Sequence, residues 1–387
     1  MFKLYNSQSQ ISSDLSKLFK NIFPTISKPH LKIVPDIIIG MIKAESVVTT
    51  DIIKKIKDPW CEVQPASIER KFERFFNNNK FLPYDFYDFY DSIIKHIIKN
   101  YKLKNNNVYI SFDHMYCKDK FTIFLLSLII CKQGIPLWFR CFQGVDDPDA
   151  FNLSLMNQGI SYVHNLFKDK NCKLIFLADR WFNFREIMQH IESLGDTYCI
   201  RTKSNVSIEI DDYIYSDMIS TIADIEPLFS KSKYFDSVRI TSFKFQTKLA
   251  VSKTDSHKEP FFILTNGNTR EAIKHYGYRF GSIEFIFKNQ KSNGFYLEST
   301  KMRNIQSFTT LFTLVCVAIL WLTILGADYS KNKNHFKNCF KIRYSKKNGS
   351  NYKRTFSLFN TGLLFFNLAF ESTKYVALKC SFILYDI

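Results

Sequence analysis

The sequence lacks the cysteine pattern of a zinc site or a disulfide framework. Its nine cysteines include no pair at CxxC spacing, and the eight histidines do not stand near them at zinc-ligand spacing. The number of cysteines is odd, and most of them lie inside apolar runs. We therefore expect buried free thiols in a protein of a reducing compartment.

The N-terminus lacks the pattern of a secretory signal. Residues 1–15 contain no continuous apolar core and no small-residue cleavage site. One stretch, residues 308–326, is uncharged and long enough to cross a membrane. Four threonines dilute it, and the sequence has no second stretch of this kind, which favours a buried core helix. We therefore expect no membrane partner.

The chain carries a large excess of positive charge. It has 53 lysines and arginines against 36 acidic residues, a formal net charge of +17. Such an excess favours a polyanionic partner, which is either nucleic acid or an anionic membrane surface. With 387 residues, 46% of them hydrophobic, the chain has room for two or three domains and a large core.

Residues 1–105 predict a helical domain, because apolar residues recur at helical spacing near both of its ends. Between these segments, Ser67 is expected to cap an amphipathic helix. This helix carries three basic residues among its phenylalanines, namely Arg70, Lys71 and Arg74. The pattern suits a DNA-binding helix, and it equally suits the solvated face of an ordinary helical bundle.

The next part, residues 106–202, predicts an α/β unit. Strands are expected at 108–113, 120–131 and 135–143, and their short connections make them antiparallel neighbours. A helix that begins near Pro148 and a fourth strand at 173–178 follow. A crossover helix normally returns the chain parallel to an earlier strand, so the fourth strand is expected beside the first.

This topology would bring two acids together. Asp113 ends the first strand, and Asp179 follows the fourth. Ligand sites of open α/β sheets form at the carboxyl ends of the strands. Carboxylates that converge there suit Mg²⁺, which prefers oxygen ligands.

The remaining sequence changes character three times. Residues 203–270 alternate like strands and predict a β-rich insertion, after which residues 271–328 return to the core. Residues 329–354 carry nine lysines and arginines and no acid, which predicts a basic region. This region opens the C-terminal part, 329–387, which closes with another apolar helix.

A third acid stands at the start of a predicted helix. Gly281 and Ser282 form a break and a capping position, so Glu284 falls in the first turn, where the helix dipole favours negative charge. Lys288 and Lys291 lie on the same face of this helix. An acid that binds metal beside cations that hold DNA phosphates would explain the pattern, and so would an ordinary surface Glu–Lys pair.

Three segments together resemble the DDE transposases of bacterial insertion sequences, in particular the insertion-sequence-four type. The segments are SFDHMY, LADRWF and YGYRFGSIEFIFKNQK. The third matches the family motif through Tyr276, Arg279, Glu284 and Lys291, although four residues instead of three separate the arginine from the glutamate. On a continuous helix, the extra residue would rotate Arg279 by about 100° away from the Glu284 face.

The resemblance implies a fold and a mechanism. The fold is α/β, an RNase H-like mixed sheet flanked by helices, with a β-rich insertion and a helical N-terminal DNA-binding domain. Asp113, Asp179 and Glu284 would bind two Mg²⁺ ions, for which Mn²⁺ can substitute, and would catalyse DNA cleavage and strand transfer. The residues expected to contact DNA are Tyr276, Arg279, Lys288, Lys291, Arg180, Arg70, Lys71 and Arg74.

The resemblance also implies partners and a location. The expected partner is double-stranded DNA, both the terminal inverted repeats of the element and the target. A homodimer is expected on DNA, with residues 329–387 serving DNA contact or dimerisation. The expected location is the bacterial cytoplasm, at the nucleoid.

Several alternatives stay open. Glu298 competes with Glu284 for the third position, while a loop and a helix start account for Asp146, Asp147 and Asp149. Trp181 either packs against the sheet or stacks on a displaced base. A DNA-binding protein of transposase ancestry that no longer cuts, and a membrane-associated basic protein, are the alternative functions.

Overall fold

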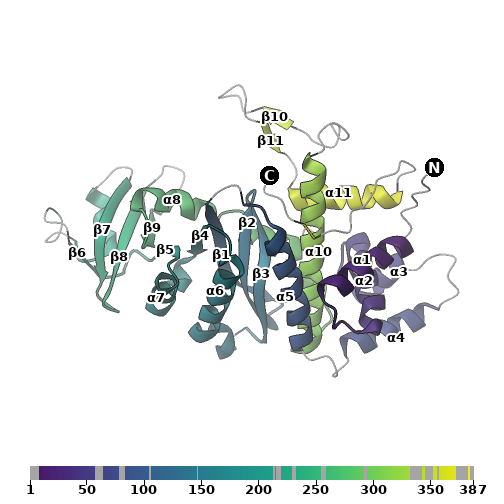
Figure 1. Ribbon diagram of the computed structural model, residues 1–387. Helices are drawn as coiled ribbons and strands as arrows, with labels where there is room; N and C mark the ends of the chain where they lie inside the picture. Colours follow the sequence, from purple (N-terminus) through teal and green to yellow (C-terminus); the bar gives the residue numbers. More distant parts are fainter. Residues whose placement is uncertain are drawn as a thin grey trace.

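The computed structural model (Figure 1) describes most of the chain. The described residues are 8–56, 64–77, 83–103, 106–145, 147–211, 214, 219–228, 232–253, 259–291, 294–331, 342–344, 352–354, 357–371 and 382–383. Asp146 and most of the predicted basic segment 329–354 lie outside them. Within that segment, two short strands pair with each other, β10 (Ile342–Tyr344) and β11 (Tyr352–Arg354).

The centre of the fold is a sheet whose strand order differs from the order along the chain. β1 (Asn107–Cys117), β2 (Phe121–Ile130) and β3 (Gln133–Gln143) are antiparallel neighbours. β4 (Lys173–Ala178) pairs parallel to β1, and β5 (Thr197–Arg201) pairs parallel to β4. The order is therefore β3-β2-β1-β4-β5, and the predicted position of the fourth strand beside the first is confirmed.

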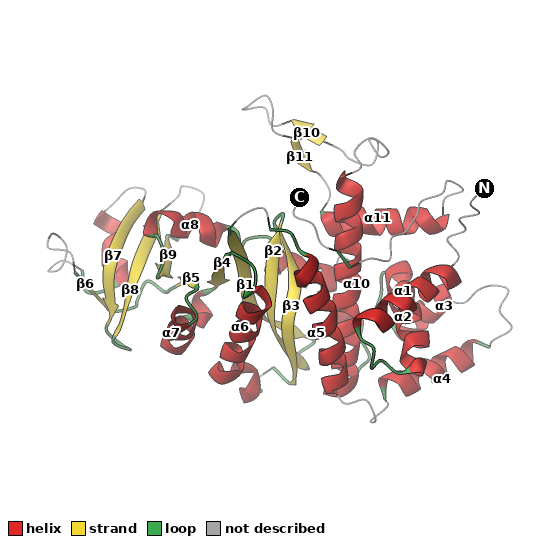
Figure 2. Ribbon diagram, viewed as in Figure 1, coloured by secondary structure: helices red, strands yellow, loops and turns green. Residues whose placement is uncertain are grey.

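The segment predicted as a β-rich insertion continues this sheet. β9 (Phe261–Thr265) pairs antiparallel to β5, and beyond it lie β8 (Phe245–Ser252), β7 (Ser232–Ile240) and β6 (Ile208–Ile210). Within the described residues, these strands and the central five form one nine-stranded mixed sheet. The predicted α/β fold class, a mixed sheet flanked by helices, is thereby confirmed (Figure 2).

Helices cover the sheet. α6 (Leu153–Phe167) contacts β2 and β3, and α7 (Arg185–Ser193) contacts β5. α8 (Thr269–Gly277) contacts β4, β5, β8 and β9, and α9 (Ile283–Lys291) contacts β1 and β3. The expected helix start at Pro148 is wrong, because that residue opens a separate 3-10 turn, η1 (Pro148–Phe151). Asn152 then caps α6, since its side chain accepts hydrogen bonds from the amides of the first turn.

The N-terminal part is helical, and it shares its core with the rest of the protein. It contains α1 (Gln8–Ile22), α2 (Lys28–Ala44), α3 (Thr49–Ile56), α4 (Pro65–Phe76) and α5 (Pro83–Asn100). One cluster of buried apolar residues runs from α1 through the sheet to the long helix α10. The helices are therefore packed against the sheet region rather than tethered to it.

α4 has the predicted amphipathic character but a different start. Ser67 does not cap it: Gln64 occupies the N-cap position, and Pro65 follows at the first position, where its fixed φ suits a helix. The phenylalanines of α4 are buried, whereas the three basic residues predicted for DNA contact are exposed, namely Arg70, Lys71 and Arg74.

The long apolar segment forms α10 (Ile305–Lys331), which stands with α5 on its sheet side and with α1 to α4 on its other side (Figure 1). Among the described residues, this helix alone is long and apolar enough to cross a membrane, and its most apolar window is 100% buried inside the protein. Phe308 stacks on Phe121 of β2 with ring centroids 4.0 Å apart. The prediction of a buried core helix is therefore confirmed.

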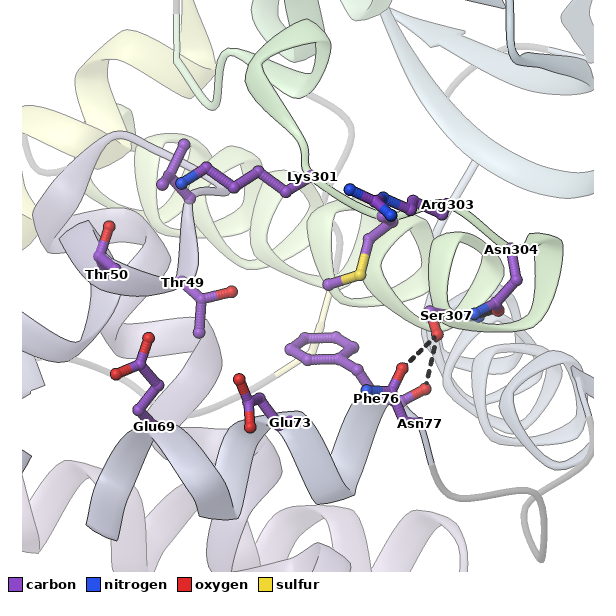
Figure 3. A pocket seen from close by; sticks show the side chains of 12 residues that line it. Thr49, Thr50, Glu69, Glu73, Phe76, Asn77, Lys301, Arg303, Asn304 and Ser307 are labelled. Atoms are coloured by element: carbon purple, nitrogen blue, oxygen red, sulfur yellow. Dashed lines mark hydrogen bonds between the residues drawn. The ribbon is translucent and has the colours of Figure 1, made fainter. Parts of the chain in front are cut away.

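A cavity of about 370 Å³ with charged and apolar lining residues separates α4 from the chain that leads into α10. Figure 3 shows Glu69 and Glu73 of α4 on one side and Lys301 and Arg303 on the other. Ser307 closes one end by donating a hydrogen bond to the carbonyl oxygen of Phe76, at 2.8 Å. Opposite charges line this cavity, so it fits neither a purely anionic nor a purely cationic ligand.

Candidate active site

Two of the predicted acids lie at the same level of the sheet. β1 and β4 pair from Asn107 opposite Lys173 to Ser111 opposite Leu177. Two further residues along this register bring Asp113 level with Asp179. The expectation that the first strand ends at Asp113 is wrong, because β1 continues to Cys117, where β2 still pairs with it.

The alternation of β1 directs its side chains to two different environments. Asp113 faces the side that carries α8, as does Tyr109, whose ring lies 4.4 Å from that of Tyr278. His114 faces the other side and stacks on Phe182, with ring centroids 5.2 Å apart. Because successive residues of a strand point to opposite faces, the acid is separated from the aromatic cluster beneath the sheet.

Asp179 is held by the turn that follows β4. Its side chain accepts a hydrogen bond of 2.9 Å from the backbone amide of Trp181 and so caps the 3-10 turn η2 (Arg180–Phe182). Phe182 is fully buried and anchors this turn in the core. The apolar strand and the buried phenylalanine therefore fix the place of the carboxylate between them.

Glu284 reaches the site because the chain breaks between α8 and α9. α8 ends at Gly277, and Gly281 has a φ of 77°, a left-handed conformation that favours glycine. α9 then begins at Ile283, so the predicted helix start is confirmed. The amide of Gly281 donates a hydrogen bond of 3.1 Å to the Glu284 carboxylate.

The loop of residues 278–282 is fixed from behind. Ser282 donates a hydrogen bond of 2.7 Å from its hydroxyl to the carbonyl oxygen of Arg279. The amide of Gly134, at the start of β3, donates to the carbonyl oxygen of Ser282 at 3.1 Å. These bonds tie the loop to the edge of the sheet.

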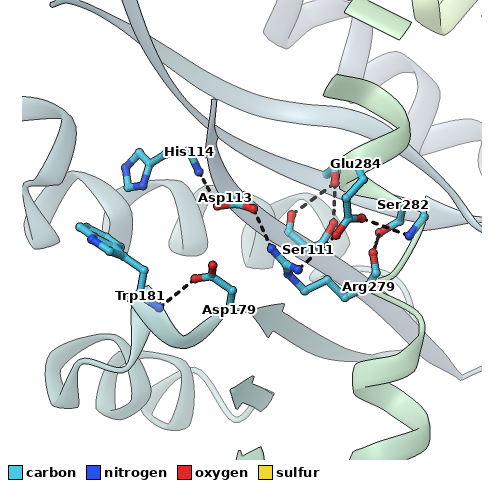
Figure 4. A network of polar contacts seen from close by, with 10 residues as sticks. Ser111, Asp113, His114, Asp179, Trp181, Arg279, Ser282 and Glu284 are labelled. Atoms are coloured by element: carbon cyan, nitrogen blue, oxygen red, sulfur yellow. Dashed lines mark hydrogen bonds and ion pairs between the residues drawn. The ribbon is translucent and has the colours of Figure 1, made fainter. Parts of the chain in front are cut away.

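Arg279 lies between two of the acids (Figure 4). One guanidinium nitrogen is 2.7 Å from Asp113, and another is 3.3 Å from Glu284. The expectation that the extra residue rotates Arg279 away from Glu284 is wrong, because residues 278–282 do not continue the helix.

The charges of this cluster are coupled. Burial raises the pKa of Asp113 to about 7, with Arg279 opposing the shift and the charges of Asp179 and Glu284 adding to it. Burial lowers the pKa of Arg279, but the surrounding carboxylates outweigh it, so the pKa of Arg279 is raised. On the other face, burial lowers the pKa of His114 to about 4, and the ring bonds to the carbonyl of Ala150 at 2.9 Å.

The acids fit Mg²⁺ by chemistry, but their arrangement is not ready for it. Carboxylate oxygens are the ligands that Mg²⁺ prefers. Yet no group of three potential metal ligands stands together in the described part of the chain. Arg279 accounts for this, because its guanidinium bridges Asp113 and Glu284.

The residues predicted to contact DNA differ in exposure. Tyr276 and Arg279 are buried, at 3% and 7% exposure, and present no surface to DNA in this structure, so a DNA contact by either stays a prediction. Lys288 is exposed, whereas the side chain of Lys291 lies outside the described residues. Arg180 is exposed and lies 3.9 Å from Glu259.

Trp181 packs against neighbouring rings, which is the first of its two expected roles. Its ring packs edge-on against His114 at 4.8 Å, and also against Phe184 at 5.3 Å. It nevertheless stays 39% exposed beside Asp179. The packing is therefore shown, while stacking on a base stays a prediction.

The rival acids lie elsewhere. Asp147 caps η1 by accepting a hydrogen bond of 3.0 Å from the amide of Asp149, which matches the loop and helix-start interpretation. Glu298 is exposed in a separate 3-10 turn, Leu297–Ser299. Arg279 joins Asp113 to Glu284 and not to Glu298.

The sequence interpretation missed Arg201 and Lys203. Both lie at or just beyond the carboxyl end of β5, the strand next to β4. With Arg180 and Glu259 they line a cavity of about 340 Å³. The cue was present in the sequence, because these two basic residues come just after the short apolar run at residues 198–200.

These features describe a carboxylate site at the edge of a mixed sheet, flanked by a basic cavity. A model of the transposase DDE domain family matches residues 105–321, which is more than half of the chain and includes all three acids. The chain therefore belongs to the transposase DDE domain family. No curated protein matches it.

One solved structure to which part of this chain is similar is Marinitoga piezophila Argonaute in complex with 5′ OH guide RNA and target DNA. The identity is 11% and the TM-score is 0.24. The similarity covers 65% of this chain and 34% of the Argonaute chain, so this protein spans about a third of that length. At this TM-score the similarity carries no argument about function.

Proposed function

We propose that the protein is a DNA transposase of the insertion-sequence-four type, which cleaves DNA and transfers the cut strand by in-line phosphoryl transfer. The observation that carries this proposal is the placement of Asp113 level with Asp179, with Glu284 in the first turn of α9, a helix that contacts β1. Phosphoryl transfer depends mainly on positioning and on stabilising charge, which carboxylate-bound cations provide.

The three carboxylates are the groups that would hold the metal. Two Mg²⁺ ions, or Mn²⁺ in their place, would activate the attacking hydroxyl and stabilise the leaving oxygen. The chain itself orients the ligands: the amide of Trp181 fixes Asp179, the amide of His114 fixes Asp113 at 2.8 Å, and the amide of Gly281 fixes Glu284.

The DNA would lie across the carboxyl edge of the sheet. The cavity that follows Asp179 in the chain is lined by Arg180, Arg201, Lys203 and Glu259, and its three cations outnumber the one acid, which pairs with both arginines, so it suits the phosphates of the DNA backbone. The exposed basic face of α4 offers a second contact, away from the cavity between α4 and α10. The net charge of +17 supports such a partner.

We further propose that the DNA comprises the inverted repeats at the ends of the element and a target duplex. The protein would act as a homodimer on DNA, in the cytoplasm and at the nucleoid. Sedimentation of the protein with and without a repeat duplex tests the dimer.

The experiment that tests the chemistry changes Asp179 to asparagine. The amide oxygen can still accept the hydrogen bond from Trp181, so the turn keeps its cap while the site loses one charge. We expect cleavage of a repeat-containing duplex in Mg²⁺ to be lost while DNA binding is kept.

Asp147→Asn is the matched control. Asp147 caps another 3-10 turn through a bond of the same kind, and it lies outside the carboxylate cluster. This variant should cut like the unchanged protein. Full cleavage by Asp179→Asn would contradict the proposed site.

A second candidate function has one observation in its favour. Arg279 bridges two of the acids, which is the arrangement expected of a DNA-binding protein that no longer cuts. Absence of cleavage by the unchanged protein, on duplexes that it binds specifically, in Mg²⁺ and in Mn²⁺, would establish this alternative.

A further inference from the structure

Arg279 takes the place of a bound cation in the carboxylate site. Its side chain is 9% exposed, and the guanidinium forms ion pairs with Asp113 and Glu284 at 2.7 and 3.3 Å. Its Nε is buried and has no hydrogen-bond partner, so a third donor of the same group points at no acceptor. A buried polar atom without a partner costs free energy, which indicates that this arrangement is held by charge and is not optimised as a permanent structural bond.

The carboxylates need a cation close to them whenever Asp113 is ionised. Asp113 is largely buried, with a side-chain exposure of 22%, and two further acids approach it. Like charges in a partly buried site repel strongly unless a cation lies among them. A guanidinium does this well, because its planar fork presents several donors to more than one carboxylate.

From this geometry we propose that Arg279 holds the metal position of the DNA-free protein closed, and that a divalent metal binds there only when Arg279 leaves the carboxylates. The proposal rests on the proposed function, from which the metal is taken. DNA provides the exchange: a backbone phosphate accepts the guanidinium while the metal takes over Asp113 and Glu284. Metal binding and DNA binding would then strengthen each other.

The location of Arg279 in the chain suits such an exchange. It lies in the five-residue connection between α8 and α9, two residues before the left-handed Gly281. The hydrogen bonds that fix this connection involve the backbone of Arg279 and the hydroxyl of Ser282, not the guanidinium. The side chain can therefore change partners while the backbone of the loop stays in place.

The test measures binding of Mn²⁺ to the DNA-free protein by the electron paramagnetic resonance signal of free Mn²⁺. Arg279→Gln should bind Mn²⁺ at least about tenfold more tightly than the unchanged protein, the factor expected when a charge-assisted hydrogen bond no longer competes. Addition of Asp113→Asn to this variant should abolish the gain in Mn²⁺ affinity. Arg239→Gln is the matched control, because it removes an Arg–Glu pair of 3.3 Å between β7 and β6, and the Mn²⁺ affinity of this variant should not change.

Equal Mn²⁺ affinity of the unchanged protein and Arg279→Gln would overturn the proposal, as would a gain that survives Asp113→Asn. If Arg279→Gln does not fold, Arg279→Lys replaces it, because an ammonium lacks the planar fork that bridges two carboxylates. Its affinity should then rise, and an unchanged value would again reject the idea. Cleavage of DNA by the unchanged protein is measured separately. If the unchanged protein never cuts DNA, the proposed function is refuted. If it cuts DNA but Arg279→Gln binds Mn²⁺ no more tightly than it does, only the exchange at Arg279 is refuted.

Discussion

The crossing of α10 and α11 (Leu358–Glu371) depends on two glycines, and this makes a strong prediction about stability. A Cβ added at Gly326 would lie 1.8 Å from the carbonyl oxygen of Leu358, and one at Gly362 would lie 1.9 Å from that of Leu322. The obstacle is helix backbone, so no side-chain rotation relieves it. The helices would have to separate, and the packing between them would be lost.

The magnitude for Gly326→Ala follows from two opposing effects. Overpacking a core costs about 1–3 kcal/mol, and a clash with backbone belongs at the upper end or above it. Alanine recovers about 1 kcal/mol through its better helix propensity. We therefore expect a net loss of about 2 kcal/mol or more in the free energy of unfolding.

Urea unfolding followed by circular dichroism measures this change. The matched control is Gly277→Ala at the end of α8, where an added Cβ would meet nothing within 4 Å. That variant should be neutral or more stable by up to about 1 kcal/mol, so only Gly326→Ala should lower the midpoint. A midpoint for Gly326→Ala at or above that of the unchanged protein would refute the backbone clash.

Three further predictions concern the site and the thiols. The ring of His114 should titrate near the pKa of about 4 in NMR spectra, because burial disfavours its charged form. Since the unfolded chain binds this proton more readily, His114 should make stability fall as pH drops from about 6.5 towards 4, a dependence that His114→Asn should lack. Gly134→Ala should weaken DNA cleavage and leave DNA binding intact. Its Cβ would lie 2.6 Å from Ile286 and 2.8 Å from the carbonyl of Ser282, and so would displace the loop that carries Arg279. Unimpaired cleavage would argue that the position of this loop does not matter for cleavage. Among the six described cysteines, the exposed Cys131 should react first with a maleimide, as followed by peptide mapping. Faster labelling of the buried Cys117 would contradict the packing of the sheet.

The strand order was predictable because it follows from chain connectivity. Short connections force antiparallel neighbours, and a crossover helix returns the chain in parallel, so the neighbourhood of Asp113 and Asp179 needed no knowledge of side-chain contacts. The end of β1 was not predictable in this way. Residues beyond Asp113 stay in the strand because β2 pairs with them, and the alternation in sequence does not reveal how far a partner strand reaches.

The position of Arg279 relative to Glu284 could not be predicted from helical periodicity. A helical rotation of about 100° per residue holds only while the helix continues. Gly281 breaks the helix, and the chain then turns back so that the two side chains meet across five residues. The sequence did contain the helix break at Gly281. The same glycine that predicts the start of α9 means that the rotation of about 100° per residue cannot be applied from Arg279 to Glu284.

The charges around the site explain why DNA binding would come before the exchange at Arg279. On one side, Arg180, Arg201 and Lys203 attract DNA to the carboxyl edge of the sheet. On the other, the carboxylates of the site would repel the same phosphates if they stood without a counter-charge. Arg279 supplies this counter-charge before DNA arrives, so the DNA meets a site that is already partly neutralised. Because the metal can replace Arg279 only when a phosphate accepts the guanidinium, a cutting-competent site would form on bound DNA and not in the free protein.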